Sequence, residues 1–347
     1  MIDWFAGYTS NWQVLRIDEK TWAPLGTLEN CYSVSISRDS DSDKLETCTM
    51  SVDLPASQDT FQEGWYRIQM VARQDSAYEL VNVATMLMSA DAGTIDKHRN
   101  TMSVTGTSVL QPAADLKMKI GDYIAKEDNG AEYAARLLRE CVVPPVIVDG
   151  KGFTVDDYIV FDEGTSYLEA AWTVLDAGGW IMKIGGDGKV TIQEKPKTSS
   201  ITMGYGDGNV EPGVSYSRPI SGVPNRYYAI DELGNTAEVI NNQPNSNTSY
   251  KARGRYIDVI DTSPEPINNE GLLGYAKRRL EEESTIYKEY TYTRPYHPDV
   301  WLFDNVFMNM PGDGLSGQLR VITQNISFGQ NISVKEKAGL EIKEYIA

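Results

Sequence analysis

The first 110 residues alternate apolar and polar side chains over several short segments, which is the pattern of half-buried β-strands. Residues 31–38 alternate tyrosine, valine and isoleucine with serine. After a polar loop at 39–43, residues 45–54 repeat the period, so the two segments predict a hairpin. The pattern continues in three further segments, at 65–73, 78–90 and 99–110. We expect five or more strands and no helix here, arranged as a barrel or a sandwich.

A different pattern begins after Pro112. Residues 129–141 have the spacing of a short amphipathic helix, with Asn129 as the N-cap and Glu132 at the reciprocal capping position. Pro144 and Pro145 end this helix, because proline cannot donate a backbone hydrogen bond.

A second helix is predicted to begin at Ser166, which can form a capping box with Glu169, and to end at Gly178 or Gly179. Two apolar runs follow it, at 180–184 and 189–193, and Asp187-Gly188 lies between them. Such a dipeptide between two β runs predicts a tight hairpin. These helices and strands indicate a small α/β region after Pro112.

The last part of the chain returns to β patterns around one long helix. Residues 197–215 are rich in serine, glycine and aspartate, which suits a domain boundary or a long loop, and 241–249 has the composition of a mobile polar loop. The helix is predicted from Asn268 or Asn269 to about Ser284. Its core face would consist of Leu272, Leu273, Ala276 and Leu280. The predicted strands lie at 225–232, 236–241, 287–296, 301–310, 318–328 and 332–345.

The exposed face of that long helix has an unusual charge order. Lys277, Arg278 and Arg279 come before three glutamates at 281–283. Cations are favoured at the C-terminal end of a helix and anions at the N-terminal end, so this order opposes the helix dipole. We therefore expect these side chains to meet tertiary contacts or a partner.

The chain is strongly acidic. It has 347 residues, with 32 lysines and arginines against 49 aspartates and glutamates, and a net charge of −17. Nucleic-acid binding depends on cations that replace the counterions of phosphate, so a DNA- or RNA-reading domain is disfavoured, as is an anionic membrane surface. No run of about 20 apolar residues is present, and the N-terminus lacks the pattern of a secretory signal peptide.

Three cysteines, Cys31, Cys48 and Cys141, form no C-x-x-C motif. An odd number without such spacing predicts reduced thiols that act as small core residues, consistent with synthesis in a reducing cytoplasm. A disulfide between Cys31 and Cys48 on neighbouring strands is the alternative.

Candidate catalytic groups are few. His98 lies in a charged turn, and His297 lies in a Pro-containing segment two residues before Asp299. The His297–Asp299 pair could indicate an oriented base, but no nucleophile accompanies it, so a structural turn is the preferred interpretation. Two histidines without a cysteine cluster or H-E-x-x-H motif predict no metal centre.

Polar motifs that could bind ligands have simpler structural interpretations. The acidic run at 39–43 lacks the glycine and glutamate of a calcium loop, with Lys44 and Met50 in their places, and 185–189 lacks the spacing of a phosphate-binding loop. We interpret both as turns. The acidic pairs Asp156/Asp157 and Asp162/Glu163 could serve a glycosidase, although such pairs are expected by chance among so many acids. We therefore expect no catalytic residue, cofactor or metal.

Three aromatic residues, Trp301, Phe303 and Phe307, alternate in the predicted strand 301–310 and would share one face. They could form core or a contact between subunits, and core is the preferred interpretation. Interaction residues cannot be assigned from sequence, because exposure depends on the fold.

The order of these parts resembles that of the phage tail baseplate hub family, found at the tail tip of siphophages and myophages and in related contractile injection systems. The resemblance covers about residues 100–345. It depends on a helix–glycine turn–hairpin unit, then a strand that opens with Pro-Asn, then a long helix, and finally a strand after "RPYHPD". In this sequence they lie at 166–196, 222–232, 270–284 and 294–311.

The resemblance implies a mainly β fold with α+β parts. Two tube-like β-barrel domains, residues 1–110 and 200–347, would flank a small α/β connector at 111–199, with the long helix of about 268–284 inserted in the second barrel domain. It also implies a structural role at the virion tail tip or baseplate. Three chains would form a ring that continues the tail tube, adapts its six-fold symmetry to a three-fold tip and conducts DNA during ejection.

The partners implied by the resemblance are two further copies of this chain, a distal tail or tail tube ring, the tape measure protein, and a spike, fibre or other tail-tip protein. DNA would pass without specific binding, since an acidic wall repels phosphate. Two other classes stay open at this point. The aromatic residues and acidic loops would suit a carbohydrate-binding or adhesin-like β protein, and an acidic pair would suit a glycan hydrolase.

Overall fold

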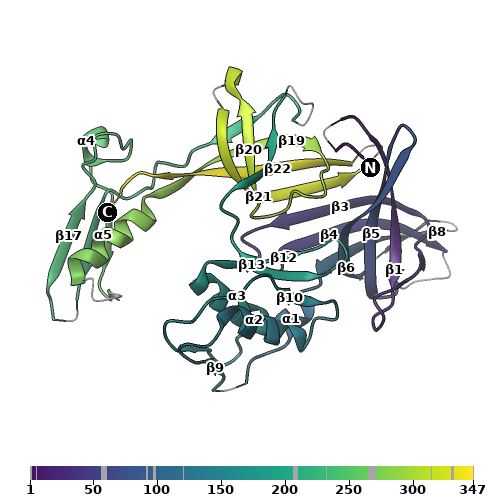
Figure 1. Ribbon diagram of the computed structural model, residues 1–347, viewed down its shortest axis with the longest axis horizontal. Coiled ribbons are helices and arrows are strands. Elements are labelled where there is room, and N and C mark those ends of the chain that lie inside the picture. Colours follow the sequence, from purple (N-terminus) through teal and green to yellow (C-terminus); the bar gives the residue numbers. More distant parts are fainter. Residues whose placement is uncertain are drawn as a thin grey trace. The chain divides into compact units, whose positions relative to one another are not determined.

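The computed structural model describes residues 2–4, 6–55, 61–90, 93–96, 99–119, 121–205, 210–231, 233–264, 271–313, 315–329 and 332–346. The protein is mainly β, with helices of 10 and 12 residues in the middle of the chain and a helix of 13 residues at 271–283 (Figure 1). It forms two compact units. Unit 1 consists of Met1–Gly213 and Tyr292–Lys337, and unit 2 of Val214–Thr291 and Ala338–Ala347.

The N-terminal strands of unit 1 form one antiparallel array in the order β3-β4-β8-β6-β5-β1-β2, with β7 paired to β8. The hairpin predicted around 39–43 is confirmed, since β3 and β4 pair from Arg38↔Glu46 to Cys31↔Val52. The strands are β1 (Thr9–Ile17), β2 (Pro24–Thr27), β3 (Cys31–Asp39), β4 (Glu46–Pro55), β5 (Gly64–Gln74), β6 (Ala77–Ser89), β7 (Gly93–Asp96) and β8 (Arg99–Ser108).

The C-terminal strands extend the same sheet. β21 pairs with β3 in antiparallel register, with Ile326 opposite Ile36 and Phe328 opposite Val34. The sheet continues from β21 to β22 and β19, while β20 pairs with β21 and β14 pairs with β20. These strands are β14 (Ser199–Met203), β19 (Thr285–Pro295), β20 (Asn305–Met310), β21 (Leu315–Phe328) and β22 (Ile332–Lys343). β19 and β22 each begin in one unit and end in the other.

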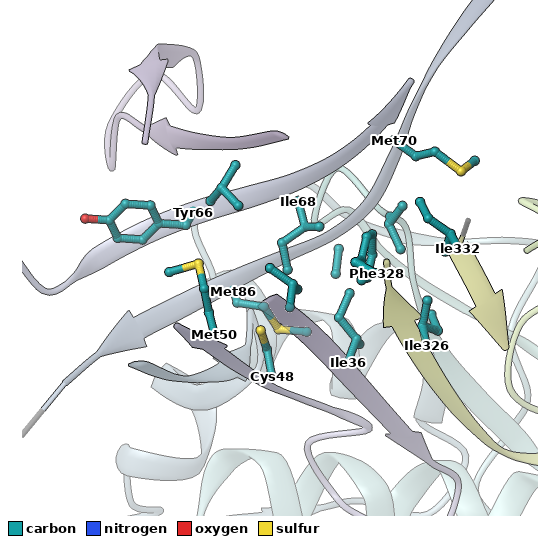
Figure 2. Close-up of a cluster of buried hydrophobic side chains, with 14 of the residues drawn as sticks. Ile36, Cys48, Met50, Tyr66, Ile68, Met70, Met86, Ile326, Phe328 and Ile332 are labelled. Carbon is teal, nitrogen blue, oxygen red and sulfur yellow. The ribbon is translucent and has the colours of Figure 1, made fainter. Parts of the chain in front are cut away.

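Both ends of the chain share one hydrophobic core in unit 1. Figure 2 shows side chains from the N-terminal strands and from β21 and β22 pointing into a common interior. The alternation predicted in 31–38 and 45–54 is explained for Val34 and Ile36 and for Cys48, Met50 and Val52, which all belong to this core, whereas Tyr32 in the same strand phase is 48% exposed. The labelled members are Ile36, Cys48, Met50, Tyr66, Ile68, Met70, Met86, Ile326, Phe328 and Ile332.

The strand order of the large sheet is an open path, with β2 at one end and β15 (Ser215–Ser217) at the other, over the residues that the structure describes. The mainly β class with α+β parts is therefore shown. The closed barrels and the domain limits at 110 and 199 stay predictions.

The α/β part of unit 1 follows the predicted order. The capping box of Ser166 and Glu169 is present at α3, and Gly179 ends the helix with a φ of +68°. Asn129 caps α2, but the Glu132 carboxylate accepts from Arg139 instead of completing a box. β12 and β13 form the predicted hairpin, and β10 adds to β13 in parallel. The elements are α1 (Gln111–Asp115), β9 (Tyr123–Ile124), α2 (Gly130–Arg139), β10 (Val146–Val148), β11 (Ile159–Val160), α3 (Tyr167–Gly178), β12 (Trp180–Ile184) and β13 (Val190–Glu194).

Unit 2 contains a three-stranded sheet in the order β17-β16-β18, which is covered on one face by α5 (Gly271–Glu283). The core between them includes Tyr227, Tyr275, Ala276 and Leu280. The prediction that Leu273 belongs to the core face is wrong: its side chain is 52% exposed, and Tyr275 is buried instead. The other elements are β16 (Arg226–Ile230), β17 (Thr236–Ile240), α4 (Tyr250–Arg253) and β18 (Asp258–Asp261). The predicted helix start at Asn268 or Asn269 lies outside the described residues.

Two segments whose composition predicts a loop have a different structure. The segment 197–215 includes strand β14, because the parallel pairing with β20 satisfies its backbone. In the segment 241–249, Asn241, Ser246 and Thr248 are buried and hydrogen-bonded to Glu344. Polar composition alone does not reveal such a buried partner from the far end of the chain.

The aromatic alternation predicted at 301–307 is also corrected. β20 begins only at Asn305, and residues 301–304 form a turn in which the Trp301 amide donates to the Asp304 carboxylate. Phe303 has a φ of +67°, which a regular strand does not allow. The core interpretation holds for Trp301 and Phe303, which are both buried, whereas Phe307 is half-buried.

Candidate functional site

His297 is a buried structural residue. Its Nδ1 atom accepts a hydrogen bond of 3.2 Å from the backbone amide of Asp299, within the predicted turn. Burial and the nearby Arg294 guanidinium lower the pKa of the imidazole, which favours the neutral form. In a catalytic histidine that is oriented by a carboxylate, Nδ1 donates a hydrogen bond to the carboxylate. Here Nδ1 instead accepts a hydrogen bond from a backbone amide, so it is not available for that role. His98 lies outside the described residues.

The glycine-rich turn at 185–188 packs against the N-terminal sheet. Thr85 Oγ1 donates to the Gly186 carbonyl at 2.8 Å, and both Trp22 Nε1 and Arg67 Nη2 donate to the Asp187 carbonyl. A Cβ atom at Gly186 would lie 1.8 Å from the Asn82 carbonyl oxygen, so this position needs glycine. The turn therefore joins the α/β part to the β part of unit 1 and leaves no cradle for a phosphate.

The acidic motifs are exposed. Asp156, Asp157, Asp162 and Glu163 lie at the surface beside β11, and residues 39–43 form the β3–β4 turn, where the Asp39 carboxylate accepts from the Asp41 amide. Within the described residues, no three histidine, cysteine or acidic side chains come together in a way that could hold a metal ion. No described helix is long and apolar enough to cross a membrane.

The cysteine thiols are free and chemically quiet. Cys48 is buried as predicted, while Cys31 and Cys141 are half-buried. Cys31 and Cys48 lie on neighbouring strands, but they face Val52 and Ile36 across the hairpin and not each other. Burial raises the pKa of the Cys31 and Cys48 thiols to about 12 and that of Cys141 to about 11. A protonated thiol is a poor nucleophile, so none of these groups suits covalent catalysis.

A buried polar network is the most constrained arrangement in unit 1. The Arg38 guanidinium donates to Glu46 at 2.7 Å, to Gln324 at 3.1 Å and to the Val83 carbonyl at 2.7 Å. Gln324 in turn donates to Glu336 at 2.7 Å. The network thus crosses from β3 and β4 to β21 and β22.

The Glu336 carboxylate is the far end of this network. It accepts from the Arg294 guanidinium at 2.5 Å and from the Tyr292 hydroxyl, and its residue is fully buried. Burial and the adjacent carboxylate raise the pKa of Tyr292 well above its ordinary value, and the Glu336 charge raises the pKa of Arg294 against the effect of burial. Tyr292 therefore stays a hydrogen-bond donor and Arg294 stays charged.

This network was not found from the sequence, although a signal was present. Arg38, Gln324 and Glu336 occupy positions that continue the buried phase of β3, β21 and β22. A charged or amide side chain in an otherwise apolar strand phase indicates a buried partner, because an unpaired buried charge is costly. The partner itself cannot be identified without the fold, since Arg38 and Gln324 are 286 residues apart.

We compared the chain with known proteins. No family model and no curated protein matches it. Solved structures do match. The prophage MuSo2 43 kDa tail protein from Shewanella oneidensis gives a TM-score of 0.66 at 14% identity, over 96% of this chain and 99% of that one. A tail protein from Neisseria meningitidis gives 0.65 at 11% identity, over 96% and 97%.

Two further structures extend the likeness. The prophage tail protein gp18 from Listeria monocytogenes gives a TM-score of 0.52 at 9% identity, over 94% of each chain. A chain of the Francisella PdpA-VgrG complex gives 0.56 at 7% identity, over 98% of this chain and 60% of that one. The resemblance to the baseplate hub family is thus confirmed at the level of the fold: this chain has the fold of phage tail proteins, whereas the two closed barrels and the domain limits stay predictions.

Proposed function

We propose that the chain is a structural hub protein of a phage tail tip or a related injection machine. The observation that carries the proposal is the extent of the likeness to the Shewanella oneidensis tail protein, which spans 96% of this chain and 99% of that one. A likeness that leaves no large part of either chain unmatched favours a role that uses the whole molecule, not a module attached to another activity.

In this role three copies form a ring. The ring continues the tail tube on one side and presents three-fold symmetry to a spike, fibre or other tip protein on the other. Each chain supplies two tube-like domains, so three chains supply six. The core of unit 1 supports this arrangement, because strands from the beginning and from the end of the chain pack together in it.

The net charge of −17 supports a conduit for DNA. An acidic wall repels phosphate, which shortens the residence of DNA on the surface during ejection. The partners in the assembled tail are the distal tail or tail tube ring, the tape measure protein and the tip proteins. The place of action is the virion tail tip.

The groups surveyed above favour assembly over catalysis. The His297 imidazole is held in a turn, the free thiols have raised pKa values, and the acidic pairs beside β11 are exposed at the surface.

Electron microscopy of the purified chain at high concentration, alone and with the matching tail tube protein, tests the proposal. Three-fold rings with a central hole, seen alone or stacked on tubes, are the expected result. Monomers under both conditions would overturn the hub role, and so would turnover of peptidoglycan or glycosides by the purified chain.

A further inference from the structure

An acidic, apolar surface lies on the α/β part of unit 1. The short strands β9 and β11 pair through Tyr123↔Val160, and the side chains of Tyr123, Tyr158 and Val160 are 54%, 60% and 71% exposed. The two tyrosine rings lie 6.0 Å apart. Asp156 and Asp162 flank them at alternate positions of the same segment and are also exposed. We call these five residues the acidic lobe.

A basic, apolar surface lies on unit 2. Tyr256 is stacked on Tyr250 at 4.2 Å, and the Arg226 guanidinium lies 3.8 Å from the centre of the Tyr256 ring. Lys251 and Arg255 are exposed beside these rings, and Ile260 is 62% exposed on the face of β18 opposite to α5. We call Lys251, Arg255, Tyr256 and Ile260 the basic lobe.

The basic lobe is built as a rigid surface. The Arg226 guanidinium is held by both carboxylate oxygens of Asp258, at 2.8 and 2.6 Å, and Arg253 donates to the carbonyls of Val223 and Ile220. The guanidinium groups of Arg226 and Arg253 are therefore engaged in hydrogen bonds within unit 2. Lys251 and Arg255 project from α4 and the turn after it, with no ion pair found for either within the described residues.

The two lobes are complementary. Each presents exposed tyrosine and aliphatic side chains, which are common at the centre of protein interfaces. The charged side chains that define the lobes, two aspartates on one and a lysine and an arginine on the other, are opposite in sign, and the exposed carboxylate of Asp258 beside Ile260 is already paired with Arg226. A chain of net charge −17 repels its own copies on average, so any contact between copies needs a local excess of cations on one side. The basic lobe supplies that excess.

We propose that the acidic lobe of one chain binds the basic lobe of a second copy. The contact joins two different surfaces, so it is head-to-tail, and repetition of such a contact gives a closed ring or an open filament. The inference deepens the proposed function, because it assigns residues to the contact between chains of the ring, and it rests on that function for the ring itself.

Charge reversal tests the contact. One variant carries Asp156→Lys and Asp162→Lys, a second carries Lys251→Glu and Arg255→Glu, and a third carries all four substitutions. Sedimentation velocity at low ionic strength over a range of protein concentrations gives the association constant of each. We expect the wild type to self-associate, each two-residue variant to associate about tenfold more weakly or worse, and the four-residue variant to recover the wild-type constant.

A matched variant controls for net charge. Glu19→Lys with Glu63→Lys adds the same four charges as the acidic-lobe variant, at exposed positions of unit 1 outside the lobe. It should associate as well as the wild type or better, and circular dichroism should show that every variant is folded. Added salt should weaken the wild-type association, since the paired charges lie near solvent.

Three outcomes of the sedimentation experiment would reject the contact between the two lobes, and electron microscopy distinguishes this failure from failure of the hub role. A wild type that stays monomeric at low ionic strength, an association indifferent to both reversals, or a four-residue variant that does not recover would each reject the contact. If rings nevertheless appear by electron microscopy on tail tubes, the hub role stands and the chains meet through other surfaces.

Discussion

Units 1 and 2 both pack a sheet against buried apolar side chains, and both have exposed ion pairs, such as Arg139–Glu132 in unit 1, but the ion pairs found with both partners buried lie in unit 1. In unit 1, both partners of Arg38–Glu46 and of Arg294–Glu336 are at most 2% exposed. In unit 2, each of the ion pairs found keeps at least one partner in contact with solvent, as Arg278–Glu282 does on α5 and Arg218–Glu344 does at its arginine.

This difference separates two uses of charge. A buried ion pair favours the strand register in which its partners meet, because another register leaves a charge unpaired in the core. Exposed pairs contribute little to stability and are free to serve contacts with other molecules. The buried pairs therefore make the large sheet of unit 1 a fixed framework, whereas the exposed charges of both units suit recognition.

Removal of Glu336 should give the largest effect and tests the framework directly. In Glu336→Ala, the Arg294 guanidinium and the Tyr292 hydroxyl lose their buried acceptor, and the free energy of unfolding should fall by about 3–5 kcal/mol. Urea denaturation followed by tryptophan fluorescence measures the loss. The matched change Glu282→Ala removes a surface partner of Arg278 and should cost at most about 1 kcal/mol. Equal losses in the two variants would abolish the distinction between the units.

Leu280→Ala tests whether unit 2 depends on its apolar core in the ordinary way. Leu280 is fully buried between α5 and the three-stranded sheet, so the cavity should cost about 2–5 kcal/mol. Leu273→Ala, on the exposed side of the same helix, is the control and should change stability by about 0.5 kcal/mol or less. Hydrogen exchange of α5 amides measures both. A large loss from Leu273→Ala would instead place that side chain in a contact.

Gly186→Ala tests the junction inside unit 1. The added methyl would collide with the Asn82 carbonyl, so the β12–β13 turn should withdraw from β6 at a cost of about 1–3 kcal/mol. Gly222→Ala, where a Cβ atom meets open space, serves as the control. Thermal unfolding followed by circular dichroism compares the two. If both glycines tolerate alanine equally, the α/β part does not rely on this contact.

The smallest expected effect concerns pH. The folded-state pKa of His297 is below its ordinary value, so the unfolded chain binds a proton more readily, and stability should fall as pH drops from 7 through the ordinary histidine range. Protonation of Nδ1 would also break its bond from the Asp299 amide. His297→Gln should flatten the fall measured by denaturation at several pH values, and His98→Gln is the matched control. An unchanged slope in His297→Gln would exclude this imidazole as the cause.

The α/β part shows how far local sequence rules reach. The capping box at Ser166, the stop at Gly179 and the β12–β13 hairpin were all predicted, because each depends on residues within a few positions of one another. The same rules gave the β3–β4 hairpin. Where they failed, the deciding contact came from elsewhere: β14 forms because β20 offers a backbone edge, and Tyr275 replaces Leu273 in the core because of how α5 sits on its sheet.

The sequence by itself therefore determined the mainly β class, most strand positions, the capped helix and the glycine turn. It also supplied the acidity that disfavours nucleic-acid recognition and the order of parts that resembles the hub family. The tertiary structure alone decided that Arg38 meets Gln324 across 286 positions, that His297 is a buried turn residue, and that the acidic and basic lobes are exposed. The physical reason is that periodicity and capping act over a few residues, whereas a buried partner or an exposed surface exists only once distant strands have paired.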